Sequence, residues 1–481
     1  MEKPEHREDR MARHEDAHVI VVGGGLAGIS AAIEASKARA KVTLIEKEKE
    51  IGGNSAKATS GINACGTRVQ KSSGVEDDGR YFERDTHVSA KGGRADLGCV
   101  STLSEKSAEA IHWLMDELGV PLTALSQLGG HARKRTHRVP PRTDGAPVPV
   151  GFTIMQHAKA AASAFEGIEI KTRCSMTRLL HETTSEGRTE VVGLEYRDES
   201  TGETHELQAD AVVLTTGGFG YDHLEGSLMQ KYRPDLVGVP TTNGAFANGD
   251  GIKFGADIGA TLVDMDKVQL HPTAFIDPKD PGNHTKYLGP EALRGSGGIL
   301  LDQQGRRFSN ELDLRSVVSK RILENCEPYK MPDGTEYRPW AWCLLNEEAQ
   351  EKFGRPMLSF YKDQVGLFEA AEGTKELAEL IGCEEEALIQ TLKDYAAACD
   401  RKICTKTGKV VFPSRMCETD KNFIVARITP CIHYCMGGLE IDVESAVVGE
   451  NGKAIPGLYA AGEVAGGVHG NNRLGGNSLL D

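Results

Sequence analysis

Two histidines, two arginines and a glutamate draw attention first, because side chains of these types together suit the binding of a small anion. They come from four segments of the chain: His271 in HPT, Glu291 and Arg294 in PEALRG, His433 in HYCMGG, and Arg473 in HGNNRLGGNSLLD. A charged carboxylate leaves water only where cationic or hydrogen-bond-donating groups replace its hydration. Brought to one cavity, these side chains would therefore bind a small dianion.

The N-terminal part of the chain has the residue order of a dinucleotide site. Residues 18–22 (HVIVV) form a short apolar run, which predicts a buried parallel strand. A glycine motif, a helical pattern at 29–38, a second strand at 41–45 and an acid follow: Gly23, Gly25, Gly28 and then Glu46. The glycines let the backbone and the helix N-terminus approach a pyrophosphate, and the acid accepts hydrogen bonds from a ribose.

Three further segments favour FAD over NAD as the nucleotide. Residues 51–63 are a glycine-rich stretch without a strand or helix pattern, long enough to wrap an extended cofactor, and residues 211–220 and 456–463 each predict a strand that ends in small residues. The contacts predicted here and at the C-terminus are Gly53, Asn54, Ser55, Gly61, Gly217, Gly218, Glu463, Asn477, Ser478 and Leu479. Contact from both ends of the chain predicts a discontinuous, Rossmann-like α/β domain.

Length and composition limit the class of protein. A chain of 481 residues is too long for one core and predicts two or more domains. The net charge of −14 argues against nucleic acid as a partner. The basic run HARKRTHR at 131–138 is a local exception, and it fits a solvated loop and a positive rim on an anion site about equally well.

The sequence also predicts a soluble, intracellular protein without a metal. No apolar run approaches the roughly 20 residues of a membrane helix, and the charged residues 1–16 form an extension rather than a secretory signal. The eleven cysteines follow no disulfide framework and no CxxC or HExxH motif is present, so we expect free, mostly buried thiols and no metal site. The cytoplasm is the default compartment, with the mitochondrion or glycosome left open.

The motifs together resemble the flavoprotein family of fumarate reductases and succinate dehydrogenases. The resemblance runs from about residue 17 to the end and rests on four segments: HPTAFIDPKDPGNHTKYLGPEALRGSGG, RRFSNELDLRS, HYCMGG and HGNNRLGGNSLL. Within the family the chain is most similar to the soluble fumarate reductases, particularly the central domain of the NADH-dependent enzymes of kinetoplastid protozoa. The resemblance implies an α+β capping domain at 266–425, inserted between FAD-binding parts at 17–265 and 426–481, and the periodicity of residues 376–400 indicates helix in it.

The resemblance also implies a role for each candidate side chain. His433 and Arg473 match the family's pair that binds one substrate carboxylate, and His271 matches the histidine that binds the other. Arg315, in NELDLRS, matches the arginine that serves as general acid, and Glu291 and Arg294 match the groups that relay protons to it. The implied reaction is hydride transfer from flavin N5 to one alkene carbon of fumarate, with Arg315 protonating the other carbon.

Several departures from the family pattern qualify this assignment. Pro290 stands where the family often has a threonine whose hydroxyl helps to bind a carboxylate, so that contact is lost or comes from elsewhere. Cys435 stands where HYTMGG would have threonine, and we interpret it as a packing substitute rather than an oxidation-sensitive thiol. Membrane-bound members attach FAD to a histidine. The matching stretch at 54–61 has none, with Ser55 at about that place, which predicts non-covalent FAD.

Two further expectations concern a segment that would follow Asp481 and the source of electrons. The family continues beyond NSLL into a helix whose N-terminus lies under the flavin, where it stabilises reduced flavin, whereas this chain stops at Asp481. We therefore expect a fragment of a longer polypeptide with a truncated flavin site. Since no second dinucleotide fold or haem motif is visible, the electrons must come from a separate domain or protein.

Three functions compete on this evidence. Reduction of fumarate is the first. Oxidation of succinate or of L-aspartate in the same cationic pocket is the second, although the covalent flavin that usually accompanies succinate oxidation is not predicted. The third is a non-catalytic module that binds a dicarboxylate and FAD, which the filled catalytic positions disfavour.

Overall fold

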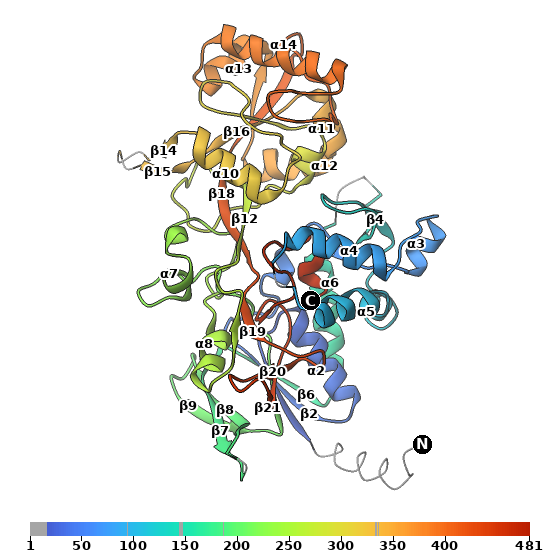
Figure 1. Ribbon diagram of the computed structural model, residues 1–481, viewed down its shortest axis with the longest axis vertical. Coiled ribbons are helices and arrows are strands. Elements are labelled where there is room, and N and C mark those ends of the chain that lie inside the picture. Colours follow the sequence, from blue (N-terminus) through green and yellow to red (C-terminus); the bar gives the residue numbers. More distant parts are fainter. Residues whose placement is uncertain (1–16, 94, 144–147, 186, 332–333, 335) are drawn as a thin grey trace.

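A six-stranded sheet organises the lower part of the molecule in Figure 1, and its strands come from both ends of the chain. The computed structural model describes residues 17–481 except 94, 144–147, 186, 332–333 and 335; the predicted extension at 1–16 lies outside the described residues. The sheet order is β20 (Ala446–Val448), β21 (Ala454–Ala460), β10 (Ala211–Leu214), β1 (His18–Val22), β2 (Lys41–Glu46) and β6 (Ile168–Thr172). All neighbouring pairs are parallel except β20 with β21.

Hydrophobic side chains cover both faces of this sheet. In β1, Ile20 and Val22 belong to one core and Val21 to the other, as expected for a parallel strand buried on both sides. The helices α2 (Leu26–Lys37) and α6 (Val150–Ala164) contribute to the second core. Because β10 pairs with β1, and β21 from the C-terminal part of the chain pairs with β10, the predicted discontinuous Rossmann-like arrangement is confirmed.

A second sheet of five strands forms the upper part of the molecule (Figure 1). It consists of β12 (Val268–Phe275), β18 (Asn422–Cys435), β16 (Ala341–Leu345), β13 (Ile299–Leu301) and β17 (Glu369–Glu372). In β16, Cys343 and Leu345 face one core while Trp342 and Leu344 face the other. The strand β18 runs through the predicted boundary at 425–426, and the division into domains stays a prediction.

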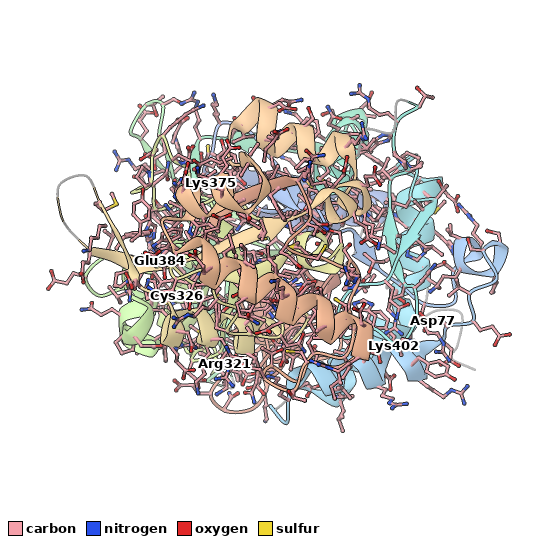
Figure 2. All side chains as sticks on the ribbon, turned by 90° about the horizontal axis from the view of Figure 1, so that it is seen from above. Asp77, Arg321, Cys326, Lys375, Glu384 and Lys402 are labelled. Carbon is pink, nitrogen blue, oxygen red and sulfur yellow. The ribbon has the colours of Figure 1, made fainter. Side chains whose placement is uncertain are left out.

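Helices pack on this upper sheet. These are α10 (Arg315–Asn325), α13 (Gly373–Ile381) and α14 (Glu385–Arg401), and the last two carry the predicted helical pattern at 376–400. The pattern is interrupted at Gly382, whose φ of 82° ends α13 in a left-handed conformation. Seen from above, Glu384 and Lys402 lie at the two ends of α14, and Lys375 belongs to α13 (Figure 2).

Further elements flank the lower sheet. They comprise the antiparallel sheet of β7 (Cys174–Thr183), β8 (Thr189–Asp198) and β9 (Thr204–Gln208), the helices α4 (Gly79–Ala90) and α5 (Leu97–Asp116), and the small sheet of β3 (Ile62–Asn63), β5 (Thr136–Arg138) and β4 (Ala124–Ser126). The stretch 51–63, predicted to lack strand and helix, contains β3 and a short 3-10 turn at Ser55–Lys57. Among the described residues, no helix has the length and apolar character needed to cross a membrane.

A buried charge cluster fixes the segment that leads into α10. Glu311 is fully buried and accepts hydrogen bonds from Arg307 Nε and Nη2 and from Lys409 Nζ, each at 2.8 Å. Burial opposes ionisation of Glu311, but the charges of Arg307 and Lys409 outweigh it and hold its pKa at about 2. The cluster lies one helical turn before Arg315 and so anchors the start of α10.

We expect Glu311→Gln to lower the free energy of unfolding by about 3 kcal/mol, because it leaves two buried cations without their carboxylate. The folded pKa of about 2 lies below the ordinary 4.5, so this contribution is present above about pH 4.5 and is lost as the pH falls towards 2. Urea unfolding at several pH values measures both effects. Glu351→Gln, which affects an exposed ion pair with Arg355, is the control and should change little. Equal effects of the two substitutions would contradict the cluster's role.

Candidate active site

The main cavity of the molecule lies between the two sheets and has a volume of ≈ 710 Å³. That is within the range of cofactor and ligand pockets. Eleven of the predicted contacts line it: Gly23, Gly25, Glu46, Gly53, Asn54, Ser55, Gly61, Gly217, Glu463, Ser478 and Leu479. Arg315, His433 and Arg473 line it as well, so predicted nucleotide and anion contacts share one cavity.

The glycine motif forms the cradle at one end of this cavity. The helix α2 begins at Leu26 after Gly25, which provides no side-chain cap, so the backbone N–H groups of its first turn other than that of Leu26, which donates to Ser55 Oγ, are available to a ligand. Gly28 does not line the cavity. A Cβ atom there would lie 1.9 Å from the Gly23 carbonyl oxygen, so Gly28 serves the close packing of helix on strand.

Two acids mark opposite sides of the nucleotide end. Glu46 accepts hydrogen bonds from the N–H groups of Gly24 (2.7 Å) and Glu48 (2.8 Å), and its burial raises its pKa. Glu463 accepts one from the N–H of Cys435 at 2.9 Å, and burial raises its pKa to about 7. Both oxygens of Glu46 are thus already engaged with the backbone, and a ribose would share or replace those contacts.

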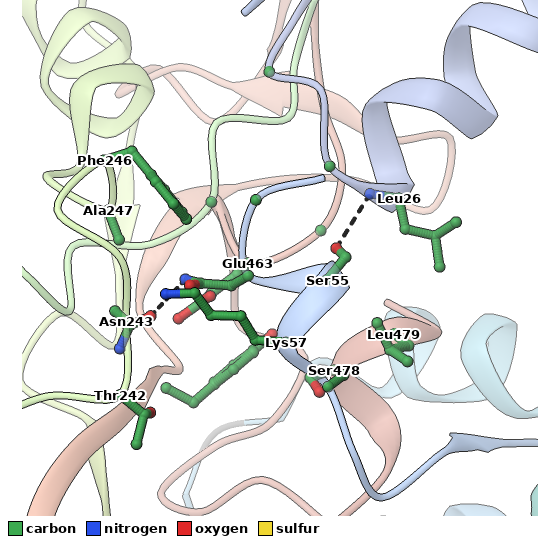
Figure 3. Close-up of a pocket in the computed structure, with 18 of the residues that line it drawn as sticks. Leu26, Ser55, Lys57, Thr242, Asn243, Phe246, Ala247, Glu463, Ser478 and Leu479 are labelled. Carbon is green, nitrogen blue, oxygen red and sulfur yellow. Dashed lines mark hydrogen bonds between the residues drawn. The ribbon is translucent and has the colours of Figure 1, made fainter. Parts of the chain in front are cut away.

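The loop after β2 is held by polar side chains that the sequence singled out. Ser55 Oγ accepts a hydrogen bond from the N–H of Leu26, and Asn54 Nδ2 donates to Asn243 Oδ1 at 2.7 Å (Figure 3). Lys57, which was not predicted, lies in the same close-up with its Nζ 5.4 Å from the centre of the Phe246 ring. Burial lowers the pKa of Lys57.

Asn477 and Gly218, also predicted as cofactor contacts, lie beside residues that line the cavity but do not line it themselves. Asn477 is buried, and its Oδ1 accepts a hydrogen bond from Asn63 Nδ2 at 2.7 Å. Gly218 is not on the wall either, and a Cβ atom there would lie 2.6 Å from Glu463 Oε1. Both residues therefore position groups that do line the cavity.

We expect the substitution Gly25→Ala to weaken FAD binding without preventing the protein from folding. The added Cβ would meet no atom closer than Ser55 Oγ at 3.5 Å, so we expect the protein to fold. FAD should bind at least about tenfold more weakly, because the methyl group occupies the approach of the pyrophosphate. Fluorescence titration with FAD and urea unfolding measure the two effects. Gly28→Ala should instead lose the fold, and normal FAD binding by Gly25→Ala would contradict this placement of the pyrophosphate.

At the other end of the cavity, Arg315 is held by two partners. Its Nε donates to Glu291 Oε1 at 2.7 Å and its Nη1 donates to Gln269 Oε1 at 2.9 Å. Arg294 lies behind the pair, with Nη2 3.7 Å from Glu291 Oε1 and Nη1 donating to the Glu311 carbonyl at 2.7 Å. The three predicted catalytic residues thus form one buried chain of charges, although Glu291 and Arg294 do not line the cavity.

The three predicted substrate-binding residues converge on the same place. The rings of His271 and His433 are 5.3 Å apart, and Thr242 Oγ1 lies 2.8 Å from His433 Nδ1. The Arg473 guanidinium stacks on the Tyr434 ring at 4.3 Å, and its Nε has no hydrogen-bond partner among the described residues. His271 does not line the cavity itself and lies behind His433.

Burial and like charge keep the histidines neutral. Burial, followed by the charge of Arg315, places the pKa values of His271 and His433 well below their usual range. Burial also lowers the pKa of Arg473. Burial opposes ionisation of Glu291 too, but the charge and hydrogen bond of Arg315 outweigh it and hold its pKa at about 2. The site therefore contains a carboxylate–arginine pair and neutral imidazoles.

Gln269 and Thr242 are site residues that the sequence reasoning missed. Gln269 Nε2 donates to Asn472 Oδ1 and to the Arg473 carbonyl, which turns its Oε1 towards both Arg315 and Arg473. The sequence signal that could have identified Gln269 is its spacing from His271: the two polar residues alternate with Leu270 in β12 and so lie on the same face of the strand. Thr242 lines the cavity and offers a hydroxyl where Pro290 cannot.

Two sequence interpretations need correction. In the basic run at 131–138, His131, Arg135 and His137 are buried, and Arg135 forms ion pairs with Asp77 and Asp85, each at 3.0 Å. The run is therefore not a solvated loop as a whole, although Lys134 is exposed, and none of its residues lines the cavity. The cysteines are also less uniformly buried than expected, because five are partly exposed: Cys326, Cys383, Cys399, Cys404 and Cys417. Cys435 is fully buried, and burial raises the pKa of its thiol, in keeping with a packing role.

Comparison with known proteins agrees with this geometry. The family model described as "FAD binding domain" matches residues 18–479. The chain is 39% identical over 471 residues to a fumarate reductase of Schizosaccharomyces pombe, covering 98% of this chain and 88% of that protein. It is 38% identical to fumarate reductase 1 of Saccharomyces cerevisiae, covering 96% of this chain and 95% of that one.

The chain belongs to this flavoprotein family. The open conformation of a flavocytochrome c3 fumarate reductase superimposes on all of it with a TM-score of 0.78 and 31% identity, covering 79% of that chain. The protein is accordingly an FAD-dependent oxidoreductase. The groups of the cavity fit the cofactor, because uncapped amides at the start of α2 face a pyrophosphate site and Glu46 and Glu463 suit hydroxyl groups.

Proposed function

We propose that this flavoprotein reduces fumarate to succinate. The observation that supports this most strongly is the charge balance at the end of the cavity. Arg294, Arg315 and Arg473 carry three positive charges, and in the part of the chain that the structure describes only Glu291 forms an ion pair with any of them. Although Asp481 and Glu463 also line the cavity, neither forms an ion pair with these arginines, so this end of the cavity has unpaired positive charge that suits a dicarboxylate.

Two groups of residues would hold the two carboxylates. Arg473 and His433 bind one of them, since both line the cavity and Arg473 Nε lacks a partner among the described residues. The other carboxylate would lie towards His271, which adjoins His433 without lining the cavity, and the Thr242 hydroxyl would supply the contact that Pro290 removes. The imidazoles are neutral before binding, so a dianion raises their pKa values and favours their protonated, donating forms.

Arg315 would act as the general acid. An arginine is a poor acid in water because its pKa lies far above neutrality. It serves here because proton transfer accompanies addition to the alkene, when the developing carbanion is strongly basic. Glu291 and Arg294 return the proton, and the low pKa of Glu291 keeps it ionised between turnovers.

FAD, when bound, supplies the hydride that the alkene accepts. We propose that it is held without a covalent bond, because the loop at Asn54 and Ser55 has no histidine and both side chains are engaged in hydrogen bonds within the protein. Its electrons would come from a donor on another domain or protein.

The alternatives use the same pocket. Oxidation of succinate or of L-aspartate would need the same carboxylate contacts, and the flavin potential decides the direction of the reaction. A module that binds a dicarboxylate without turnover would not need the pairing of Arg315 with Glu291.

Fumarate-dependent oxidation of reduced methyl viologen, with flavin absorbance recorded alongside, tests the proposal. Turnover by a yellow protein supports it. A yellow protein that fails with fumarate but oxidises succinate or L-aspartate points to the second function. A yellow protein that binds fumarate without any turnover points to the binding module.

A further inference from the structure

His131 is a buried histidine that the proposed reaction does not use. It lies in the loop between β4 and β5, and its Nε2 is 2.8 Å from the Gly475 carbonyl oxygen. A carbonyl oxygen only accepts, so Nε2 must carry the hydrogen. Burial lowers the pKa of His131 to about 4, which keeps the ring a neutral donor at ordinary pH.

Gly475 connects this histidine to the catalytic pair. A Cβ atom on Gly475 would lie 3.5 Å from Arg315 Nη2 and from Glu291 Oε2, so Gly475 faces both groups across a space that one side-chain atom would fill. The Gly475 carbonyl also accepts a hydrogen bond from Asn63 Nδ2 at 2.8 Å. Gly475 is therefore held by hydrogen bonds from His131 and Asn63, and it adjoins the Arg315–Glu291 pair.

We infer that His131 is a positioning residue for the Arg315–Glu291 pair, an inference that rests on the proposed function. Arg315 begins α10, which packs on the upper sheet, whereas His131 follows β4 of the small sheet that flanks the lower one. Glu291 Oε2 is buried without a hydrogen-bond partner among the described residues, and it faces Gly475 across that narrow space. The hydrogen bond from His131 keeps that backbone in place while the acid works.

A second buried, neutral histidine in the segment 131–138 allows a positioning role of His131 to be distinguished from a purely structural one. His137 is fully buried, its pKa is also lowered to about 4, and its ring nitrogens contact Thr67 Oγ1 and the Arg135 carbonyl. It matches His131 in burial and in segment, but its side chain has no contact with Gly475. His137→Leu is therefore the matched control.

The experiment compares His131→Leu, His131→Gln and His137→Leu in the FAD-loaded full chain, with all rates divided by bound FAD. We expect His131→Leu to lower kcat about tenfold and to raise the solvent deuterium isotope effect, with KM for fumarate changed less than about twofold, because proton transfer tolerates little displacement. His131→Gln keeps an N–H at a similar reach and should retain most of the rate. His137→Leu should leave the isotope effect unchanged.

Other outcomes overturn the inference. An unchanged kcat and isotope effect in His131→Leu would do so, as would equal losses in His131→Leu and His137→Leu. If His131→Leu fails to fold, His131→Asn takes its place, since its amide falls short of Gly475.

A crystal structure of the His131 variant gives a reading that does not depend on fumarate. Gly475, Glu291 and Arg315 should be displaced in it, and unchanged positions would overturn the inference whatever the substrate is. Absence of fumarate turnover in the unaltered protein would instead count against the proposed function.

Discussion

Arg315→Gln is expected to lower fumarate turnover by at least about 10³-fold, because a general acid of this kind contributes about that much. The glutamine side chain can fill much of the space of the guanidinium. It can neither donate the proton to the substrate nor neutralise the negative charge of Glu291. FAD should stay bound, since Arg315 approaches the cavity from α10 and the nucleotide contacts come from the other sheet. Steady-state turnover with reduced methyl viologen, and flavin content, measure the two effects.

Arg321→Gln is the matched control for this result. Arg321 lies on the same helix α10 but is exposed (Figure 2), so its replacement should leave turnover unchanged. Turnover that survives largely intact in Arg315→Gln would show that another group donates the proton. A colourless Arg315→Gln protein would show instead that the residue serves the cofactor site.

The low pKa of Glu291 supports the same assignment from another direction. A carboxyl group with a pKa of about 2 is ionised throughout the neutral range, but it is a weak base while Arg315 is charged. Once Arg315 has given up its proton, the main cause of the low pKa is removed and burial raises it, so Glu291 can then take a proton from Arg294 and pass it to Arg315. Without Arg315 the main cause of this low pKa is gone, and burial would raise it. The loss in Arg315→Gln therefore includes the return path as well as the donor.

Local sequence patterns predicted the nucleotide half of the molecule well. The run HVIVV is β1 residue for residue, and the glycines and Glu46 follow at the end of a strand as the fingerprint requires. Such patterns depend on contacts within about 30 residues, where backbone geometry limits the possibilities. The family resemblance added the candidate residues outside this half.

The contacts between distant segments could not be predicted in the same way. Arg135 appeared to belong to a basic surface, but Asp77 and Asp85, some fifty residues earlier, form ion pairs with it in the interior. Gln269 gave only a weak signal, because its importance comes from Asn472 and Arg473, which lie two hundred residues further along the chain. A sequence pattern carries no information on which distant partner meets a polar side chain.

Arg473→Ala is expected to weaken fumarate binding by about 10²-fold or more, because loss of one partner from a buried charge pair costs about 2–5 kcal/mol. Arg473 differs from Arg315 in having no ion pair among the described residues. Its guanidinium rests on Tyr434, and its Nη2 only approaches Gln269 Oε1 at 3.4 Å. Much of its hydrogen-bonding capacity is therefore free for a substrate carboxylate. Fumarate titration of the oxidised protein, monitored by flavin absorbance, measures the dissociation constant.

The control for Arg473→Ala must remove an arginine that is stacked in the same way without facing the cavity. Arg133 meets this condition, because its guanidinium lies 4.3 Å from the Tyr81 ring, the same distance as Arg473 from Tyr434. Arg133→Ala should leave fumarate affinity unchanged. If both substitutions weaken binding equally, the effect is one of net charge at long range, and raising the salt concentration should abolish it. If neither does, the carboxylate site lies elsewhere in the cavity, and the charge balance that supports a dicarboxylate substrate loses its meaning.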